Sequence, residues 1–508
     1  MIMKKLLIFL LAFSVCMCLA ACGEVPSVAK PTKEPTHSQL PTESDPTQYY
    51  PDYHEHEWLD ATCTTPKTCM ICGETEGQVG SHPYFETGRV EPTSKNDGFV
   101  NYTCDVCGHV YQEILSATGS EGLEYEDRGD GTCWVSGIGT CTDSHIVIPS
   151  RYQDMIVTGI DEHAFINCDI EGMTLPSTIT FIDGLAICNC EKLQYTEYDG
   201  CKYLGNESNP YLVLMKPISA EETTYTIHRD TKVIGGQAFL DCYSLVTISI
   251  PDSVTHINTM AFSDCTGLQN ITLGSGIVDV GYAFQECNAL QYTEYGDCKY
   301  LGNGSNPYMV LVTTVVQNKT SYTIHSDTKV IAGAAFNQCH QSQSVIIPDG
   351  VISICESAFI GNDLRQIVIP DSVTYLGEAA FMACGLESVV IGNGITRISK
   401  EAFYGCSKLA SVTFGNQVTG IGQAAFFLCY GLRSIEIPDS VRIIGTCAFD
   451  ECYYLSKISL GSGIVSLRQF ALYTGSTNVT IYFDGTMEQW EALEYEANRV
   501  QCIDGWIA

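Results

Sequence analysis

The chain has 508 residues, of which 45% are apolar and 17% are charged, so it can bury a core and is not a disordered polymer. Its 59 acidic residues outnumber its 26 basic ones and give a formal net charge of -33. A surface this negative repels phosphate backbones, and we therefore expect no nucleic-acid partner. The length would suit about three domains, unless internal repeats place it in one body.

The first residues have the pattern of an export signal. Lys4 and Lys5 precede an apolar run of roughly 14 residues, which is shorter than the roughly 20 needed to span hydrocarbon. The run ends in the letters LAAC, with Cys22 last, and this ending resembles the lipobox of bacterial lipoproteins. The resemblance implies that residues 1–21 are a signal peptide and that lipidated Cys22 holds the protein at the outer face of the cell membrane. A plain secretory signal with a chance cysteine is the alternative.

Residues 22–53 have the composition of a tether. Six prolines lie among Thr, Ser, Glu and Lys, with hardly any large aliphatic side chain, so this segment cannot bury a core. Proline-rich chain favours an extended conformation, which would hold the folded part away from the membrane.

Residues 54–115 form a predicted cysteine and histidine module of zinc-ribbon-like character. Two C-x-x-C pairs, each followed by glycine, suit tetrahedral thiolate coordination of one structural zinc ion. The primary ligand candidates are Cys69, Cys72, Cys104 and Cys107. An ion held by the first pair alone would use other side chains, and the alternatives are His56, Cys63 and His82. Disulfides remain a second interpretation for an exported chain. The first half resembles short modules in surface proteins of Gram-positive bacteria.

The rest of the chain repeats one phrase. An A-F-x-x-C pattern returns every 22 or 23 residues, apart from two steps of 52, and well-formed copies read L-x-x-I-x-I-P-x-x-V-x-x-I-x-x-x-A-F-x-x-C. In one such copy we expect Leu245, Ile248 and Ile250 to face inward from a short strand that Pro251 ends. Because one turn cannot cover its own apolar face, the turns must stack.

This phrase resembles the BspA-type leucine-rich-repeat family over residues 116–490. The resemblance implies a repeat solenoid, a right-handed superhelix with short parallel strands and short helical turns. It also implies an exported bacterial protein that displays the solenoid, often for adhesion or host binding. Near the end, Thr486 and Gln489 match a capping box, so we expect a short helix carrying Trp490 to close the solenoid, with 491–508 as cap and tail.

The two 52-residue steps contain inserts at 194–226 and 291–323, which are copies of each other 97 residues apart. Asp199-Gly200 between tyrosine-rich alternations predicts a hairpin turn, and we expect each insert to project a small ribbon from the solenoid. Its tyrosines either offer a binding surface or pack on the flank of the solenoid.

One position of the repeat is occupied by cysteine in ten copies and by Asn362 in another. Side chains on one ladder point the same way and not at each other, which disfavours disulfides between them. We therefore expect a small buried group that hydrogen-bonds loop backbone.

No catalytic motif stands out, and we expect no enzymatic activity. Side chains between the inward positions of the strands should instead form an outward, hydroxyl-rich face that could bind a protein or glycan ligand on host or neighbouring cells. The candidate binding residues are Thr247, Ser249, Asn270, Thr272, Gln366, Ser388, Ser411, Thr413, Ser434 and Glu436. The alternatives are a structural surface scaffold without a dedicated ligand, or a glycan-processing enzyme that uses Glu197 and Glu294.

Overall fold

The computed structural model describes residues 83–92, 98–115, 119–317, 319–337, 339–476, 478–493, 495 and 500–507, and three short strands before them. The chain divides into two compact units, Met1–Gly80 and Ser81–Ala508. In the first unit the three strands pair antiparallel: β1 (Trp58–Leu59), β2 (Lys67–Cys69) and β3 (Thr75–Glu76). Within these described parts, no helix has the length and apolar character needed to cross a membrane.

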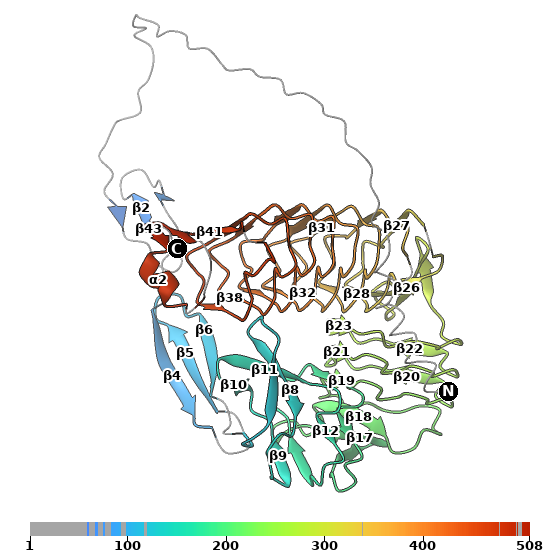
Figure 1. Ribbon diagram of the computed structural model, residues 1–508. Coiled ribbons are helices and arrows are strands. Elements are labelled where there is room, and N and C mark those ends of the chain that lie inside the picture. The colour runs from blue at the N-terminus through green and yellow to red at the C-terminus, as the bar shows by residue number, and fades with distance from the viewer. Residues whose placement is uncertain are drawn as a thin grey trace, which may run out of the picture. The chain divides into compact units, whose positions relative to one another are not determined.

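The second unit begins with two small sheets (Figure 1). The first is an antiparallel meander of β4 (Tyr84–Val90), β5 (Gly98–Cys104) and β6 (Val110–Leu115). The second contains β7 (Glu124–Asp127), β8 (Thr132–Gly137), β10 (Arg151–Tyr152) and β11 (Met155–Ile160). Because β8 pairs with β11 in parallel, this second sheet already has the strand direction of the repeats that follow.

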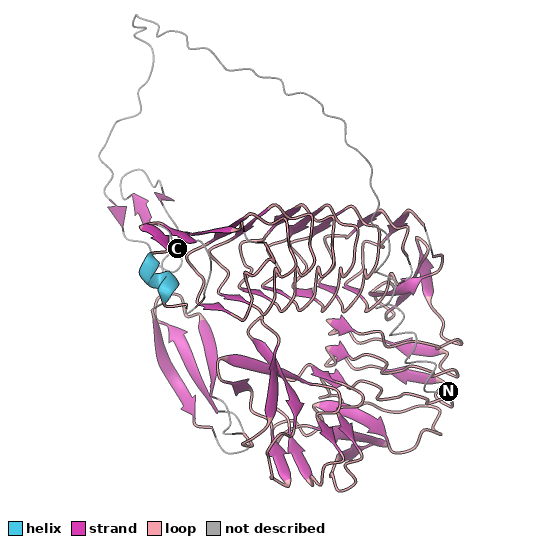
Figure 2. Cartoon of the chain, viewed as in Figure 1, coloured by secondary structure: helices cyan, strands magenta, loops and turns pink. Residues whose placement is uncertain are grey.

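Each repeat that follows contributes up to two short strands, which stack in parallel on the strands of neighbouring turns (Figure 2). The first strands are β9 (His145–Val147), β13 (Gly172–Thr174), β20 (Thr247–Ser249), β22 (Asn270–Thr272), β27 (Ser321–Thr323), β29 (Ser344–Ile346), β31 (Gln366–Ile369), β33 (Ser388–Ile391), β35 (Ser411–Thr413), β37 (Ser434–Ile437), β39 (Lys457–Leu460) and β41 (Thr480–Phe483). The second strands are β14 (Phe181–Ile182), β19 (Val233–Ile234), β21 (His256–Ile257), β23 (Asp279–Val280), β28 (Val330–Ile331), β30 (Ser353–Ile354), β32 (Tyr375–Leu376), β34 (Arg397–Ile398), β36 (Gly420–Ile421), β38 (Ile443–Ile444) and β40 (Ser466–Leu467). Two further strands, β12 (Phe165–Ile166) and β15 (Ile187–Cys188), pair at the A-F position of the first turns.

The apolar lining is shared between turns, as the repeat phrase predicts. In β20 the central Ile248 is buried while Thr247 and Ser249 on either side are exposed. The phenylalanines of successive turns stack nearly parallel: the rings of Phe359 and Phe381 have centroids 5.1 Å apart at an interplanar angle of 2°. Since each ring covers the next, removing one exposes two neighbours.

The expected short helical turns are wrong for the A-F-x-x-C segments, which are hydrogen-bonded turns. The residue before the alanine and the third residue after it commonly adopt a positive φ, as do Glu401 (59°) and Gly405 (70°) on either side of Ala402. An α-helix needs consecutive residues in the right-handed region, so two left-handed residues four positions apart prevent it.

A short helix closes the solenoid at its C-terminal end, as the sequence predicts. Helix α2 (Met487–Glu491) has the capping box, with the Thr486 hydroxyl accepting from Gln489 N and the Gln489 side chain accepting from Thr486 N. Trp490 is buried against the solenoid core. The strands β42 (Val500–Cys502) and β43 (Gly505–Ile507) then extend the sheet of β41.

Each insert forms an antiparallel hairpin with a third strand. In the first, Tyr198 pairs with Cys201 and so encloses the predicted two-residue turn Asp199-Gly200. The expectation that the ribbon projects is wrong, because β18 pairs in parallel with β19, and Tyr203 is fully buried. Burying one face of the hairpin makes it an additional turn of the solenoid. The insert strands are β16 (Thr196–Tyr198), β17 (Cys201–Leu204) and β18 (Val213–Pro217), then β24 (Thr293–Tyr295), β25 (Cys298–Leu301) and β26 (Val310–Thr314).

The run of second strands is interrupted at both inserts in the same way. The turn before the first insert bonds to a turn beyond it, where Gly236 N donates to Ile182 O at 2.9 Å. At the second insert Gly333 N donates to Val280 O at 2.7 Å. Three stretches of the second-strand side, one before, one between and one after the inserts, thereby contribute to a single cavity.

Candidate functional site

The exposed side chains of the first strands form two rows, which we call the strand face. The rows run in register: Gln366 pairs with Ser388, which pairs with Ser411. All the predicted binding residues lie on this face, and they are exposed except for Ser388, which is half-buried. The structure thus brings together small polar groups at the spacing of adjacent strands, about 4.8 Å.

An apolar row interrupts the hydroxyl groups of the strand face. Ile346, Val368 and Val390 expose 80%, 61% and 41% of their surface, and Val368 and Val390 are direct cross-strand partners. The row becomes polar at Thr413 and Glu436. Three neighbouring β-branched side chains are exposed to water here, and a ligand that covers them would gain the free energy of removing their apolar surface from water. Both valines stand at the alternating outward positions of their strands, whereas Ile346 lies between two buried residues in a run of three apolar letters, so the sequence does not mark it as outward.

The predicted zinc ligands are only partly described. Cys104, at the end of β5, is buried, and Cys107, in the turn that follows, is exposed. Cys69 is the last residue of β2, and only its backbone is described. The remaining predicted residues of the anchor and the module lie outside the described residues: Cys22, His56, Cys63, Cys72 and His82. In the parts of the chain that are described, no group of three or more His, Cys, Asp and Glu residues could hold a metal ion.

The two acids considered for catalysis lie on different hairpins. Glu197 faces Lys202 across the first hairpin, and Glu294 faces Lys299 across the second. Both acids are exposed on the edge strands β16 and β24. Each therefore has a cross-strand lysine and not a second carboxyl group as its neighbour, which does not resemble the paired carboxylates of glycoside hydrolysis.

The cysteine ladder has the structural role that the sequence predicts. The Cys406 thiol donates to the carbonyl of Phe381 in the preceding turn, at 3.1 Å, and the Asn362 amide donates to Phe336 O at 3.2 Å. Burial raises the pKa of Cys406 to about 12, so the group remains a protonated donor. The same bond is made by Cys190, Cys265, Cys287, Cys384, Cys429 and Cys452.

A polar cavity of about 480 Å³ lies on the second-strand side. Its walls come from the β7–β8 hairpin and β11, from the turns around β21 and β23, and from the turns of β30 to β34. Acidic side chains outnumber basic ones in this lining. The acids are Glu126, Asp130, Asp161, Glu162, Asp183, Asp279, Glu356 and Glu378, and the bases Arg128, Arg397 and Lys400, with His256 beside them.

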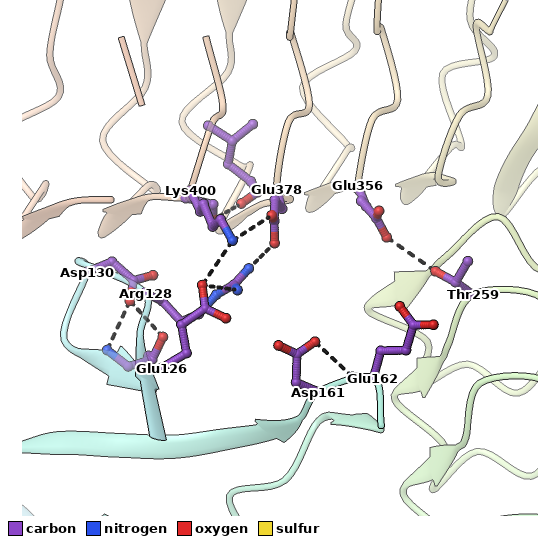
Figure 3. Close-up of polar contacts among 12 residues, drawn as sticks. Glu126, Arg128, Asp130, Asp161, Glu162, Thr259, Glu356, Glu378 and Lys400 are labelled. Carbon is purple, nitrogen blue, oxygen red and sulfur yellow. Dashed lines mark hydrogen bonds and ion pairs between the residues drawn. The ribbon is translucent and has the colours of Figure 1, made fainter. Parts of the chain in front are cut away.

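One wall of the cavity carries an ion-pair network (Figure 3). The Arg128 side chain is only 7% exposed and pairs with Glu378 and, at 3.5 Å, with Glu126. Lys400 Nζ lies 3.1 Å from Glu126 and 3.8 Å from Glu378. The Arg128 guanidinium also lies 3.9 Å from the centroid of the Trp134 ring. These contacts link the hairpin to turns more than 240 residues away, and no sequence pattern could have located them.

The ion-pair network leaves only some carboxyl groups of the cavity with a lowered pKa. Loss of solvation inside the cavity, and then the negative charges of Glu378 and Asp279, raise the pKa of Glu356 to about 7. The hydrogen bond that Thr259 Oγ1 donates to it at 3.2 Å acts in the opposite direction but is outweighed. Burial also raises the pKa of Glu378, because it outweighs the attraction of Arg128 and Lys400. At Glu126 burial also acts to raise the pKa, but the positive charges of Lys400 and Arg128 outweigh it, so the pKa of Glu126 is lowered.

These stacked turns, with an apolar lining and an exposed strand face, define a leucine-rich-repeat solenoid. A family model described as "BspA type Leucine rich repeat region (6 copies)" matches residues 141–231, 219–305, 314–385 and 374–497, which is more than half of the chain. The chain therefore belongs to the BspA-type leucine-rich-repeat family.

Among solved structures, the chain is similar to a leucine-rich repeat protein from Bacteroides ovatus, at 25% identity over 76% of this chain and 99% of that one, with a TM-score of 0.33. A leucine rich cell surface protein from Faecalibacterium prausnitzii is 23% identical over 60% and 98%, with a TM-score of 0.23. The pneumococcal vaccine antigen PcpA is 14% identical over 83% and 99%, also at 0.23. With TM-scores this low, none of these similarities bears on function. A comparison with curated proteins gives no match.

Proposed function

We propose that the chain is a non-enzymatic protein of the bacterial cell surface, held by a lipid on Cys22, which binds a protein or glycan ligand through its strand face. The observation that carries this proposal is the row of Ile346, Val368 and Val390, exposed on an otherwise hydroxyl-rich face, with Val368 and Val390 in register. An apolar centre surrounded by polar groups is the arrangement of protein-binding surfaces.

The charge of the strand face also supports ligand binding. The chain carries a net charge of -33, yet the rows of β29 to β35 present Ser, Gln, Thr and β-branched apolar side chains. A ligand that covers these rows therefore desolvates hydroxyl and methyl groups and not a field of carboxylates. Hydroxyl groups can exchange water for ligand hydrogen bonds at little net cost, which suits either a glycan or a protein surface.

The test uses the exported chain from residue 23 onward, without its lipid, on immobilised host matrix proteins and on a glycan array. We expect one of these probes to retain the protein, and the double variant Val368→Lys/Val390→Lys to bind it at least about tenfold more weakly, because two buried charges would go unpaired. Val465→Lys is the matched control, since Val465 is 56% exposed and precedes the second strand β40.

Two outcomes would contradict the strand-face proposal. Equal weakening by the Val465→Lys control would mean that added charge acts from any surface position. If neither probe retains the protein and it instead assembles with itself, the structural scaffold becomes the better interpretation, and the strand face would not bind a separate ligand.

The anchor is tested separately from the ligand. A Cys22→Ser variant should no longer incorporate a labelled fatty acid and should leave the membrane fraction for the medium. Cys16→Ser, within the signal, is the control and should leave both properties unchanged. Retention of the label by Cys22→Ser would overturn the anchor.

For the N-terminal module we propose one structural zinc ion, held by Cys69, Cys72, Cys104 and Cys107. Elemental analysis of protein purified under reducing, zinc-replete conditions should find one equivalent, and Cys72→Ser should lower it. A zinc content far below one equivalent would favour disulfides in the module.

A further inference from the structure

The tip of the β7–β8 hairpin makes a set of contacts with turns near the other end of the solenoid. The backbone N–H of Gln423 donates to the backbone carbonyl of Arg128 at 3.0 Å. Arg468 Nε lies 2.9 Å from Asp127 Oδ2. With the Arg128 and Lys400 ion pairs already described, the hairpin thus contacts the stretch from β32 to β40.

The solenoid is shaped to receive this hairpin. A Cβ atom on Gly129 would lie 2.7 Å from Gly445 Cα, and one on Gly420 would lie 3.0 Å from Asp130 O. In the same register as Gly420 the neighbouring turns carry Arg397 and Ile443. The repeat therefore lacks a side chain at Gly420, where the Asp130 carbonyl lies against it, and this absence points to a specific docking site.

The docking differs from the rest of the fold in what holds it. The tip residues 126–131 belong to none of the buried apolar clusters. The first turns of the solenoid and the turns that the hairpin tip contacts lie in separate clusters, one ending with Val233 and the other beginning with Cys298. Several partners are also partly in water, with side chains of Glu126, Asp127 and Arg468 that are 33%, 32% and 34% exposed. Ion pairs between groups that are exposed to this extent contribute little each and are screened by salt, whereas the Arg128 side chain, only 7% exposed, is screened less.

We propose that the tip of the β7–β8 hairpin is a latch that releases the turns of β32 to β40 as ionic strength rises, while the solenoid itself stays folded. In the closed state the hairpin covers the second strands around Gly420 and forms one wall of the acidic cavity. Opening exposes that second-strand surface and leaves the strand face unchanged. The latch is therefore independent of the proposed ligand site.

Two adjacent amides distinguish the latch from the solenoid. Gln423 N donates across the latch to Arg128 O, while Gly422 N donates within the solenoid to Ile398 O at 2.7 Å. Residue-resolved hydrogen exchange of the intact chain would be compared at about 0.05 M and about 1 M NaCl, where the screening length falls to roughly 3 Å. We expect exchange at Gln423 to accelerate at least about tenfold in high salt, and exchange at Gly422 to stay the same. Equal responses at both amides would overturn the proposal.

A steric variant tests the same point without salt. Gly420→Val adds a side chain that neighbouring turns tolerate in this register but that meets the Asp130 carbonyl. We expect rapid exchange at Gln423 in low salt with Gly422 still protected. The matched control Ser466→Val, in the same register in β40, should behave as the unaltered chain. Continued protection of Gln423 in Gly420→Val would contradict the latch.

A charge variant covers the case in which Gly420→Val fails to fold, which loss of protection at Gly422 would reveal. Arg128→Met removes the cation that pairs with Glu126 and Glu378 while keeping a long side chain against Trp134. We expect its Gln423 exchange to be fast already in low salt and to respond less to added salt. An unchanged salt response would overturn the electrostatic origin of the latch.

Discussion

The stacked turns and the docked hairpin join distant parts of the same molecule by different means. Neighbouring turns share rings such as Phe359 and Phe381, which are fully buried and 22 residues apart. The hairpin meets Glu378 and Lys400 across 250 and 274 residues, through charged groups that water partly reaches. Apolar burial therefore carries the stability of the stack, whereas the polar contact sets a local geometry that, in the proposed latch, can change without unfolding it.

The largest expected effect comes from breaking the stack. Phe381→Ala removes a fully buried ring that stacks on Phe359 and Phe403, so we expect a loss of about 3 to 5 kcal/mol in the free energy of unfolding. Phe470→Ala, at a ring that is 50% exposed, should cost less than about 1 kcal/mol. Urea unfolding followed by circular dichroism checks both, and comparable losses would contradict a shared ring ladder.

A smaller effect is expected from the cysteine ladder, which stabilises the stack by hydrogen bonds. Cys406→Val removes the thiol donor and leaves the buried Phe381 carbonyl with the backbone N–H of Cys384, at 3.3 Å, so we expect a cost of about 1 kcal/mol. Cys406→Asn should recover most of this loss, because Asn362 makes the equivalent bond two turns earlier. The urea midpoints of the two variants provide the measurement. If valine were tolerated better than asparagine, packing and not hydrogen bonding would explain the ladder.

The stack could be predicted from sequence because its contacts recur at one short spacing. Alternation within each strand was enough to place Ile248 inside and Thr247 outside, and Thr486 was recognisable as a helix cap. The turn geometry was missed because left-handed residues such as Glu401 are not glycines, so no letter marks them. The sequence left open whether the insert tyrosines face solvent or pack on the solenoid, because a tyrosine such as the buried Tyr203 suits a surface ribbon and a core equally well.

The cavity and the hairpin contact could not be predicted for a different reason. Whether Arg128 meets Glu378 depends on how the turns before and after the two inserts are placed, and no local sequence pattern encodes that placement. Gly420 does differ from Arg397 and Ile443, its partners in the neighbouring turns. Reading it as a docking site requires knowing what approaches it, and only the folded chain supplies that.

The smallest expected effect lies where the stack faces the hairpin, at Glu356. Its pKa is raised from 4.5 to about 7, so the folded protein binds a proton that the unfolded chain has released between these values. Stability should therefore fall as pH rises from about 4.5 to about 7, and we expect at most about 1 kcal/mol because Glu356 is partly in water. Other groups that titrate or carry charge also line this region: His256, Asp279, Tyr375, Glu378 and Arg128.

The difference in urea midpoint between the unaltered chain and Glu356→Gln isolates the contribution of Glu356. That difference should grow with pH in favour of Glu356→Gln, while Glu222→Gln, at an exposed position, should show no such trend. A pH-independent difference would mean that the stack does not sense the charges of the cavity, and the two regions would then be separate electrostatically as well as in their packing.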